Sequence, residues 1–404
     1  MVTLSERLLR LKPSPTLAAT ARARELKAQG RDVIPFTAGE PDLDTPQHVK
    51  DAALEALNKG FTKYTPVGGI PALREAICAK IKREQEIDAK PEQVVVTNGG
   101  KQALAAACAV LLNAGDEVVI PSPYWTSYPD MAELAGGVAR FVETTPEQGY
   151  LMSPEALLRA CSSRTKMVFL NSPSNPTGAC YSGAQLNALG QALMTLPNYE
   201  QIVVVSDEVY EYFTYDGFTN ESFLTACPDL RDNSLLVNAF SKTYSMTGWR
   251  VGYAYGPKRI ISAITDHQSQ FTSNVCSIAQ YAAARAYSDN CAFPKMMQGE
   301  FAKRLEIVCQ AFAEIPEIEL TPKPKGAFYA FPVIKKLFGK KGRNGTKITC
   351  GDDFSTYLLE EFDVATVPGE AFGAPDAFRM SFALDEKSLR KGLERIHDAV
   401  KGLS

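Results

Sequence analysis

Residues 235–250 read LLVNAFSKTYSMTGWR, and they join an apolar run to a lysine. The run Leu235–Ala239 is short and mostly apolar, which is typical of a strand in a sheet that is covered on both faces. Ser241 and Lys242 follow directly. In an open α/β sheet, ligands bind beyond the carboxyl ends of the strands. The order of strand, serine and lysine therefore places Lys242 where a ligand is expected.

Six further apolar runs of the same kind occur on either side of this stretch. Helical patterns separate many of them, and Ser153-Pro154 and Ser182 to Gln185 are good helix-start signals. Buried strands that alternate with amphipathic helices indicate α/β architecture with a seven-stranded, mostly parallel sheet. The six runs are Val94–Thr97, Glu117–Pro121, Val138–Val142, Met167–Asn171, Ile202–Ser206 and Val251–Tyr255.

The pattern changes near residue 296, where a long helix is expected over about 296–314. After it we expect an α+β arrangement with strands near 318–321, 326–331, 364–367 and 377–382 and helices near 353–362 and 386–401. Because 404 residues are too many for one simple core, we expect two domains. The large domain is assigned to residues 46–295, and the small domain to residues 1–45 together with 296–404.

Composition excludes several classes of function. The 43 Lys and Arg nearly balance the 46 Asp and Glu, which argues against nucleic acid or an anionic membrane as a partner. Nine single cysteines and three separated histidines predict neither a disulfide framework nor a metal site. The opening residues hold no apolar segment of signal-peptide length, and the longest apolar run is too short to span a membrane. We therefore expect a cytoplasmic protein.

Lys242 has plausible chemical partners at another strand end. A lysine whose amine is kept neutral by burial or by cationic neighbours can form a Schiff base with an aldehyde. Asp207 and Glu208 follow the fifth run, and Tyr210 comes shortly after them. A carboxylate at such a position commonly caps a turn or forms an ion pair. It can instead hold a pyridine nitrogen protonated, with Tyr210 reaching the phenolic oxygen of that ring.

Glycine and asparagine motifs mark two further strand ends. Gly99-Gly100-Lys101 lies between a strand and a helix, where amides bind phosphate and glycine permits close approach. These glycines can equally form only a tight turn. The run 171–178, NSPSNPTG, is likewise a turn signal by itself. Ser241 and Arg250 can add a hydroxyl and a bidentate guanidinium to a phosphate site.

Together these motifs resemble those of the class I aminotransferases of fold type I, over nearly the whole chain from about residue 12 to 382. The resemblance implies the fold of that family, pyridoxal 5′-phosphate as cofactor, and an obligate homodimer. The matching segments are Gly39–Asp42, Tyr64–Gly69, Gly99–Gln102, Pro123–Trp125, Asn171–Gly178, Ser206–Tyr210, Ser241–Arg250 and Arg379–Ser381.

The resemblance also implies roles around the cofactor. Lys242 resembles the Schiff-base lysine that carries the proton, and Asp207 the carboxylate that keeps the ring nitrogen protonated; with Tyr210 they form the implied catalytic set. Tyr64 resembles the tyrosine that reaches the phosphate of the neighbouring subunit. One departure is Ala239, where some members have a serine. The residues implied to bind the cofactor are Tyr64, Gly99, Gly100, Lys101, Trp125, Asn175, Asp207, Tyr210, Ser241, Lys242 and Arg250.

For the substrate, the resemblance is to the bacterial aspartate aminotransferase subgroup. Arg379 would clamp the α-carboxylate beside the Gly39 backbone, and Lys101 would bind the distal carboxylate. The residues implied to bind the substrate are Lys12, Ser14, Thr16, Gly39, Lys101, Trp125, Asn175 and Arg379.

The expected function is therefore transfer of the amino group between L-aspartate and 2-oxoglutarate by a ping-pong mechanism, with prephenate as a secondary substrate. Two alternatives stay open within the family resemblance. The first is an aminotransferase with another substrate, which would be an aromatic amino acid or prephenate, or alanine. The second is a β-lyase on the same fold, which would need no oxo-acid acceptor.

Overall fold

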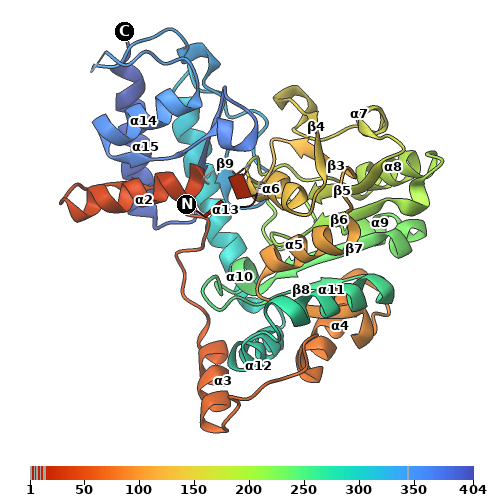
Figure 1. Ribbon diagram of the computed structural model, residues 1–404. Coiled ribbons are helices and arrows are strands. Elements are labelled where there is room, and N and C mark those ends of the chain that lie inside the picture. The colour runs from red at the N-terminus through yellow and green to blue at the C-terminus, as the bar shows by residue number, and fades with distance from the viewer. Residues whose placement is uncertain (1, 4, 6–7, 10, 12–14, 344) are drawn as a thin grey trace.

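The computed structural model describes residues 2–3, 5, 8–9, 11, 15–343 and 345–404 (Figure 1). A seven-stranded sheet with the order β2-β8-β7-β6-β5-β3-β4 forms its centre. Only β8 runs antiparallel to its neighbours, so the predicted seven-stranded, mostly parallel sheet is confirmed. Its strands are β2 (Val94–Thr97), β3 (Glu117–Ser122), β4 (Val138–Glu143), β5 (Thr165–Asn171), β6 (Val203–Asp207), β7 (Ser234–Ala239) and β8 (Gly252–Tyr255).

Helices cover both faces of this sheet because successive side chains of each strand point to opposite faces. Val118 packs in one core with α5 (Gly100–Leu111), α6 (Ser127–Leu134) and α11 (Lys258–Phe271). Its neighbour Val119 packs in another core on the opposite face. The helices of that face are α7 (Pro154–Ala160), α8 (Gly183–Met194) and α9 (Phe223–Ala226), and farther along it α3 (Gln47–Asn58), α4 (Pro71–Gln85) and α12 (Ser277–Ala286).

The second group of elements is gathered around α13 (Ala292–Ala313), which runs between the sheet and the C-terminal helices in Figure 1. A three-stranded antiparallel sheet has the order β11-β12-β9, and β1 pairs in parallel with β10. The remaining elements are α2 (Pro15–Ala28), β1 (Ile34–Pro35), β9 (Tyr329–Ala330), α14 (Gly351–Phe362), β10 (Val364–Ala365), β11 (Val367–Pro368), β12 (Phe378–Ser381) and α15 (Glu386–Lys401).

Several predicted elements of this second group differ from the structure. No strand forms over 318–321, where Glu319 makes only an isolated bridge to Val333. The strand expected over 364–367 is two short strands in different sheets. The pairing of β1 with β10, together with a 2.6 Å ion pair between Arg31 and Asp363, joins the N-terminal segment to the C-terminal part. The domain boundaries at residues 45/46 and 295/296 stay a prediction.

Among the described residues, no helix is both long and apolar enough to cross a membrane.

Candidate active site

A cavity of about 750 Å³ opens at the carboxyl ends of β5, β6 and β7, and residues from the N-terminal segment and from β12 also line it. It brings together residues that are far apart in the sequence, and most of the predicted site residues are among them. The predicted residues that line it are Thr16, Gly39, Gly100, Lys101, Trp125, Asn175, Asp207, Tyr210, Ser241, Lys242, Arg250 and Arg379.

Four predicted residues are not among those that line the cavity. Gly99 lies just before the lining residue Gly100, at the N-cap of α5. Tyr64 is 91% exposed and does not line the cavity. Lys12 and Ser14 lie outside the described residues.

Lys242 lies in the short helix α10 (Phe240–Thr243), directly after β7. Its Nζ donates a hydrogen bond to the backbone carbonyl of Gly39. Burial lowers the pKa of Lys242 to about 8, and although Glu40 opposes this shift, Arg250 adds to it. An amine with this pKa is neutral in a substantial fraction of molecules near neutral pH, so it can act as a nucleophile and a base.

Asp207 ends β6 and is only 4% exposed. Burial raises its pKa to about 6, although a 2.7 Å hydrogen bond from the Tyr128 hydroxyl opposes the shift. The Tyr128 ring stacks on Phe169, with centroids 4.6 Å apart. Sequence reasoning missed Tyr128, which follows Trp125 by three residues and lies in the first turn of α6. A buried carboxylate in such a site can bind a protonated ring nitrogen.

The N-terminus of α5 forms a cradle for an anion. Gly99 has φ +80°, and a Cβ built on it would lie 2.4 Å from Nη2 of Arg250. The guanidinium of Arg250 is held across this turn because it donates to the carbonyls of Asn98 (3.2 Å) and Thr247 (2.9 Å). Free amides at the start of a helix, a fixed guanidinium and the adjacent Ser241 are a donor set that suits a phosphate group.

Arg379 supplies a second site for an anion. It is 3% exposed, and its two Nη atoms donate to the side-chain oxygen of Asn175 and the carbonyl of Thr37, each at 3.0 Å. Its Nε is buried and has no partner. Burial lowers the pKa of Arg379, but arginine stays charged in proteins. An unpartnered donor on a buried cation beside a cavity favours a carboxylate ligand.

Two groups complete the surroundings of these cations. The hydroxyl of Tyr210 lies 2.9 Å from that of Tyr329, whose ring centroid is 4.5 Å from the guanidinium carbon of Arg379. Nζ of Lys101 lies 4.9 Å from the ring centroid of Trp125. Burial and the positive charge of Arg250 lower the pKa of Lys101. Sequence reasoning missed Tyr329, since the surrounding residues carry no motif that marks it.

Comparisons with known proteins agree with this geometry. The chain matches a family described as aminotransferase class I and II over residues 31–396. It is 47% identical to an aspartate aminotransferase of Geobacillus stearothermophilus over 98% of both chains. It is also 47% identical to an aspartate/prephenate aminotransferase of Cereibacter sphaeroides over the whole of both.

Solved structures agree as well. An aspartate aminotransferase from Rhizobium meliloti, 39% identical, has a TM-score of 0.96 over the whole of both chains. An aspartate aminotransferase from Thermus thermophilus with maleate, 40% identical, has a TM-score of 0.91 over 99% of this chain and all of the other.

Proposed function

This chain belongs to the class I and II aminotransferase family, and from that membership we propose that it is a pyridoxal-phosphate-dependent aspartate aminotransferase. The reaction is transfer of the amino group between L-aspartate and 2-oxoglutarate. One observation carries the proposal: a single cavity holds a lysine amine of lowered pKa, a buried carboxylate, and the separate cations Arg379 and Lys101. Two cations on one cavity match the two carboxylates of a dicarboxylic amino acid.

The donor set of the cavity fits pyridoxal phosphate. Lys242 would hold the aldehyde carbon, and Asp207 would hold the ring nitrogen protonated. The amides at the start of α5, with Ser241 and Arg250, would bind the phosphate. Trp125 would stack on the ring, and Asn175 and Tyr210 would hydrogen-bond its phenolic oxygen. When bound, the cofactor supplies an electron sink for the α-carbon of the substrate.

The side chains of the cavity have three further roles, which are to bind the substrate, to move its proton and to keep the cofactor ring charged. Arg379 binds the α-carboxylate and orients the substrate, with the Gly39 backbone beside it. Lys242, whose pKa burial lowers to about 8, would take up the α-proton of the substrate on Nζ and later release it. Asp207 would be held ionised by the cationic ring nitrogen of the bound cofactor, because an opposite charge lowers a carboxyl pKa and so opposes the desolvation that raises it here.

Substrate choice depends on Lys101. It would bind the distal carboxylate, and Thr16 lines the same cavity. A lysine is a point charge on a flexible stem, so it accepts more positions of a carboxylate than an arginine does. We therefore include prephenate as a secondary substrate, as in the name of the relative from Cereibacter sphaeroides.

Replacement of Lys242 tests the proposal. Lys242→Ala should lose nearly all transamination of aspartate, and its cofactor absorbance should no longer change with pH. Both losses follow because no other amine of the cavity takes the same position. A fully active variant would contradict the proposal. Assays of the wild-type enzyme with and without 2-oxoglutarate distinguish transamination from elimination, since only elimination proceeds without the acceptor.

We further propose that the enzyme is a cytoplasmic homodimer whose partner supplies Tyr64. This side chain is 91% exposed, and apolar side chains near it are exposed as well: Leu54 (58%), Leu57 (48%) and Phe61 (37%). Exposed apolar side chains within one short stretch of the chain favour an interface between protein chains.

Sedimentation should give a dimer. Tyr64→Ala and Lys242→Ala, mixed and refolded together, should regain activity, because the hybrid dimer holds one site with both residues intact. No gain over the separate variants would exclude the shared site.

A further inference from the structure

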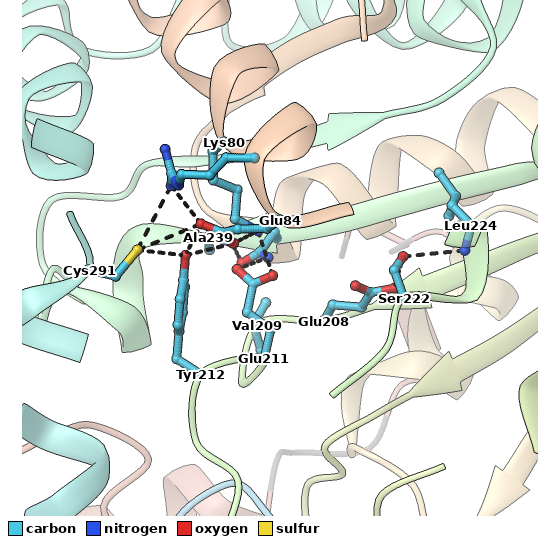
Figure 2. A network of polar contacts seen from close by, with 12 residues as sticks. Lys80, Glu84, Glu208, Val209, Glu211, Tyr212, Ser222, Leu224, Ala239 and Cys291 are labelled. Carbon is cyan, nitrogen blue, oxygen red and sulfur yellow. Dashed lines mark hydrogen bonds and ion pairs between the residues drawn. The ribbon is translucent and has the colours of Figure 1, made fainter. Parts of the chain in front are cut away.

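Lys80 is completely buried under the sheet, in α4, and two carboxylates surround its amine (Figure 2). Nζ lies 2.5 Å from Oε2 of Glu211 and 3.2 Å from Oε2 of Glu84. Burial by itself would lower the pKa of Lys80, but the two carboxylates outweigh it and raise that pKa above its ordinary value. Lys80 is therefore a permanent cation inside the protein, and it lies outside the cavity described above.

Glu211 connects this cation to both segments that carry the proposed catalytic groups. It follows Tyr210 directly, in the segment that begins with Asp207. While its Oε2 faces Lys80, its Oε1 accepts a 2.7 Å hydrogen bond from the side-chain amide of Asn238. Asn238 lies in β7, the strand that leads into Lys242. One carboxylate thus bridges the two segments.

A second contact fixes the same segment to α4. The hydroxyl of Tyr212 donates to both oxygens of Glu84, at 2.7 and 2.8 Å. Glu84 also accepts a 2.6 Å hydrogen bond from Arg83. Figure 2 shows Tyr212 and Glu211 both directed toward the helix that carries Lys80. The segment after β6 is therefore held to α4 at two successive positions.

Such an arrangement contributes little to stability, because the cost of desolvating both ions offsets their attraction. Its contribution lies in fixing geometry. We propose that Lys80 and Glu211 are positioning residues for transamination, which set the spacing between the Asp207–Tyr210 segment and Lys242. This inference rests on the proposed function, since it concerns the geometry of the same reacting groups.

The test compares Glu211→Gln, Lys80→Met and the double variant, all as cofactor-loaded enzyme. Displacement of a reacting group by about 1 Å lowers a rate on the order of 100-fold, so we expect kcat for aspartate to fall about 10- to 100-fold while KM changes less than about threefold. The circular dichroism of the bound cofactor should also change, because it reports the position of the ring. The double variant should recover part of the thermal stability that Lys80→Met loses, since Glu211 is then no longer an unpaired buried charge and Glu84 keeps Arg83 and Tyr212, yet it should keep the low kcat.

Glu117→Gln is the matched control. Glu117 is 2% exposed and binds Arg140 and Arg164. It lies at the start of β3, whereas the cavity lies at the carboxyl ends of the strands. This variant should lose thermal stability but keep kcat and the cofactor dichroism.

Wild-type kcat and dichroism in the double variant would overturn the inference and leave a purely structural ion pair. If the wild-type enzyme transaminated nothing while Glu211→Gln still changed the dichroism, the proposed function would fail and the positioning role would stand.

Discussion

Asp207 and Lys242 line one cavity, and burial moves their pKa values toward each other, to about 6 and about 8. In both cases desolvation disfavours the charged form, so both residues are less favourable to stability than neutral residues in the same places. Perturbed titratable groups of this kind are concentrated at functional sites. Both side chains can therefore gain or lose a proton near neutral pH.

Asp207→Asn should stabilise the cofactor-free protein at pH 8. The folded pKa of about 6 exceeds the ordinary 3.8, so the protonated carboxyl is favoured on folding and this stabilisation is lost as the pH rises through 6. The difference corresponds to at most roughly 3 kcal/mol at pH 8. Thermal unfolding of the variant and the wild type at pH 8 measures it, and at pH 5, where the folded carboxyl is mostly protonated, the difference should fall to about half.

The same variant should bind pyridoxal phosphate more weakly, because it cannot hold the ring nitrogen protonated. Asparagine retains an oxygen that can accept the Tyr128 hydroxyl, so a lost hydrogen bond does not confuse the comparison. If Asp207→Asn were less stable than the wild type at pH 8, the buried Asp207 carboxylate would not cost stability.

Lys101→Ala should change substrate preference. The lysine would form a charge-assisted hydrogen bond to a distal carboxylate, and such bonds contribute about 1.5–3 kcal/mol. KM for aspartate should therefore rise on the order of 10- to 100-fold, while KM for alanine, which has no distal carboxylate, should stay within about threefold. Steady-state kinetics with both amino acids decides, and equal effects on the two would remove Lys101 as the specificity residue.

Among the elements, the turn between β2 and α5 depends most on one residue. Gly99→Ala would place a methyl group 2.4 Å from Nη2 of Arg250 at a backbone φ of +80°. Both the strain and the displaced guanidinium should weaken binding of pyridoxal phosphate, about tenfold or more, if the misplaced backbone costs roughly 1–3 kcal/mol.

Gly115→Ala provides the control for Gly99→Ala. Gly115 has φ +85°, and a Cβ there would meet nothing within 4 Å. Its replacement should lower stability through strain alone and leave cofactor affinity unchanged, as measured by quenching of tryptophan fluorescence. Equal loss of affinity in both variants would mean that the cradle at Gly99 has no specific role.

The central strands could be predicted from the sequence because their own residues determine them. Val94–Thr97, for example, is buried along its whole length and reads as a continuous apolar run. The strands of the second group are different. Val364–Ala365 and Val367–Pro368 have two residues each, and their partners lie in distant segments, so pairing rather than local pattern defines them. A single strand was therefore predicted where two form.

The site residues divide in the same way, into those that the local sequence marks and those that only tertiary packing brings to the cavity. The motifs at strand ends predict site residues such as Asp207 and Lys242, and the structure places both on one cavity. Tyr128 and Tyr329 approach that cavity through tertiary packing, which sequence patterns do not specify. Lys80 looks in the sequence like an ordinary surface lysine in a helix with other charges, and only the fold reveals that it is buried.

For the molecule as a whole, stability should fall between pH 6 and pH 8 in the cofactor-free state. Glu208 is 2% exposed, and Oε1 accepts from the hydroxyls of Ser206 (2.7 Å) and Ser222 (2.8 Å) while Oε2 has no partner. Burial raises its pKa to about 7 from 4.5, so its favourable contribution is lost as the pH rises through 7.

Glu208→Gln should remove roughly 1.3 kcal/mol of this pH dependence between pH 6 and pH 8, since glutamine does not titrate. Chemical denaturation of the variant and the wild type at the two pH values measures the difference. Parallel pH profiles for the two proteins would show that Glu208 is not the group responsible.

The place of β2 has a consequence for how the enzyme is made. β2 is one of the two edge strands of its sheet and pairs with β8, which is translated long afterwards. While the ribosome is still adding the residues between them, the turn at Gly99 and Gly100 has no neighbouring strand to hold it. We therefore expect the chain to bind pyridoxal phosphate only after β8 has left the ribosome and has inserted between β2 and β7.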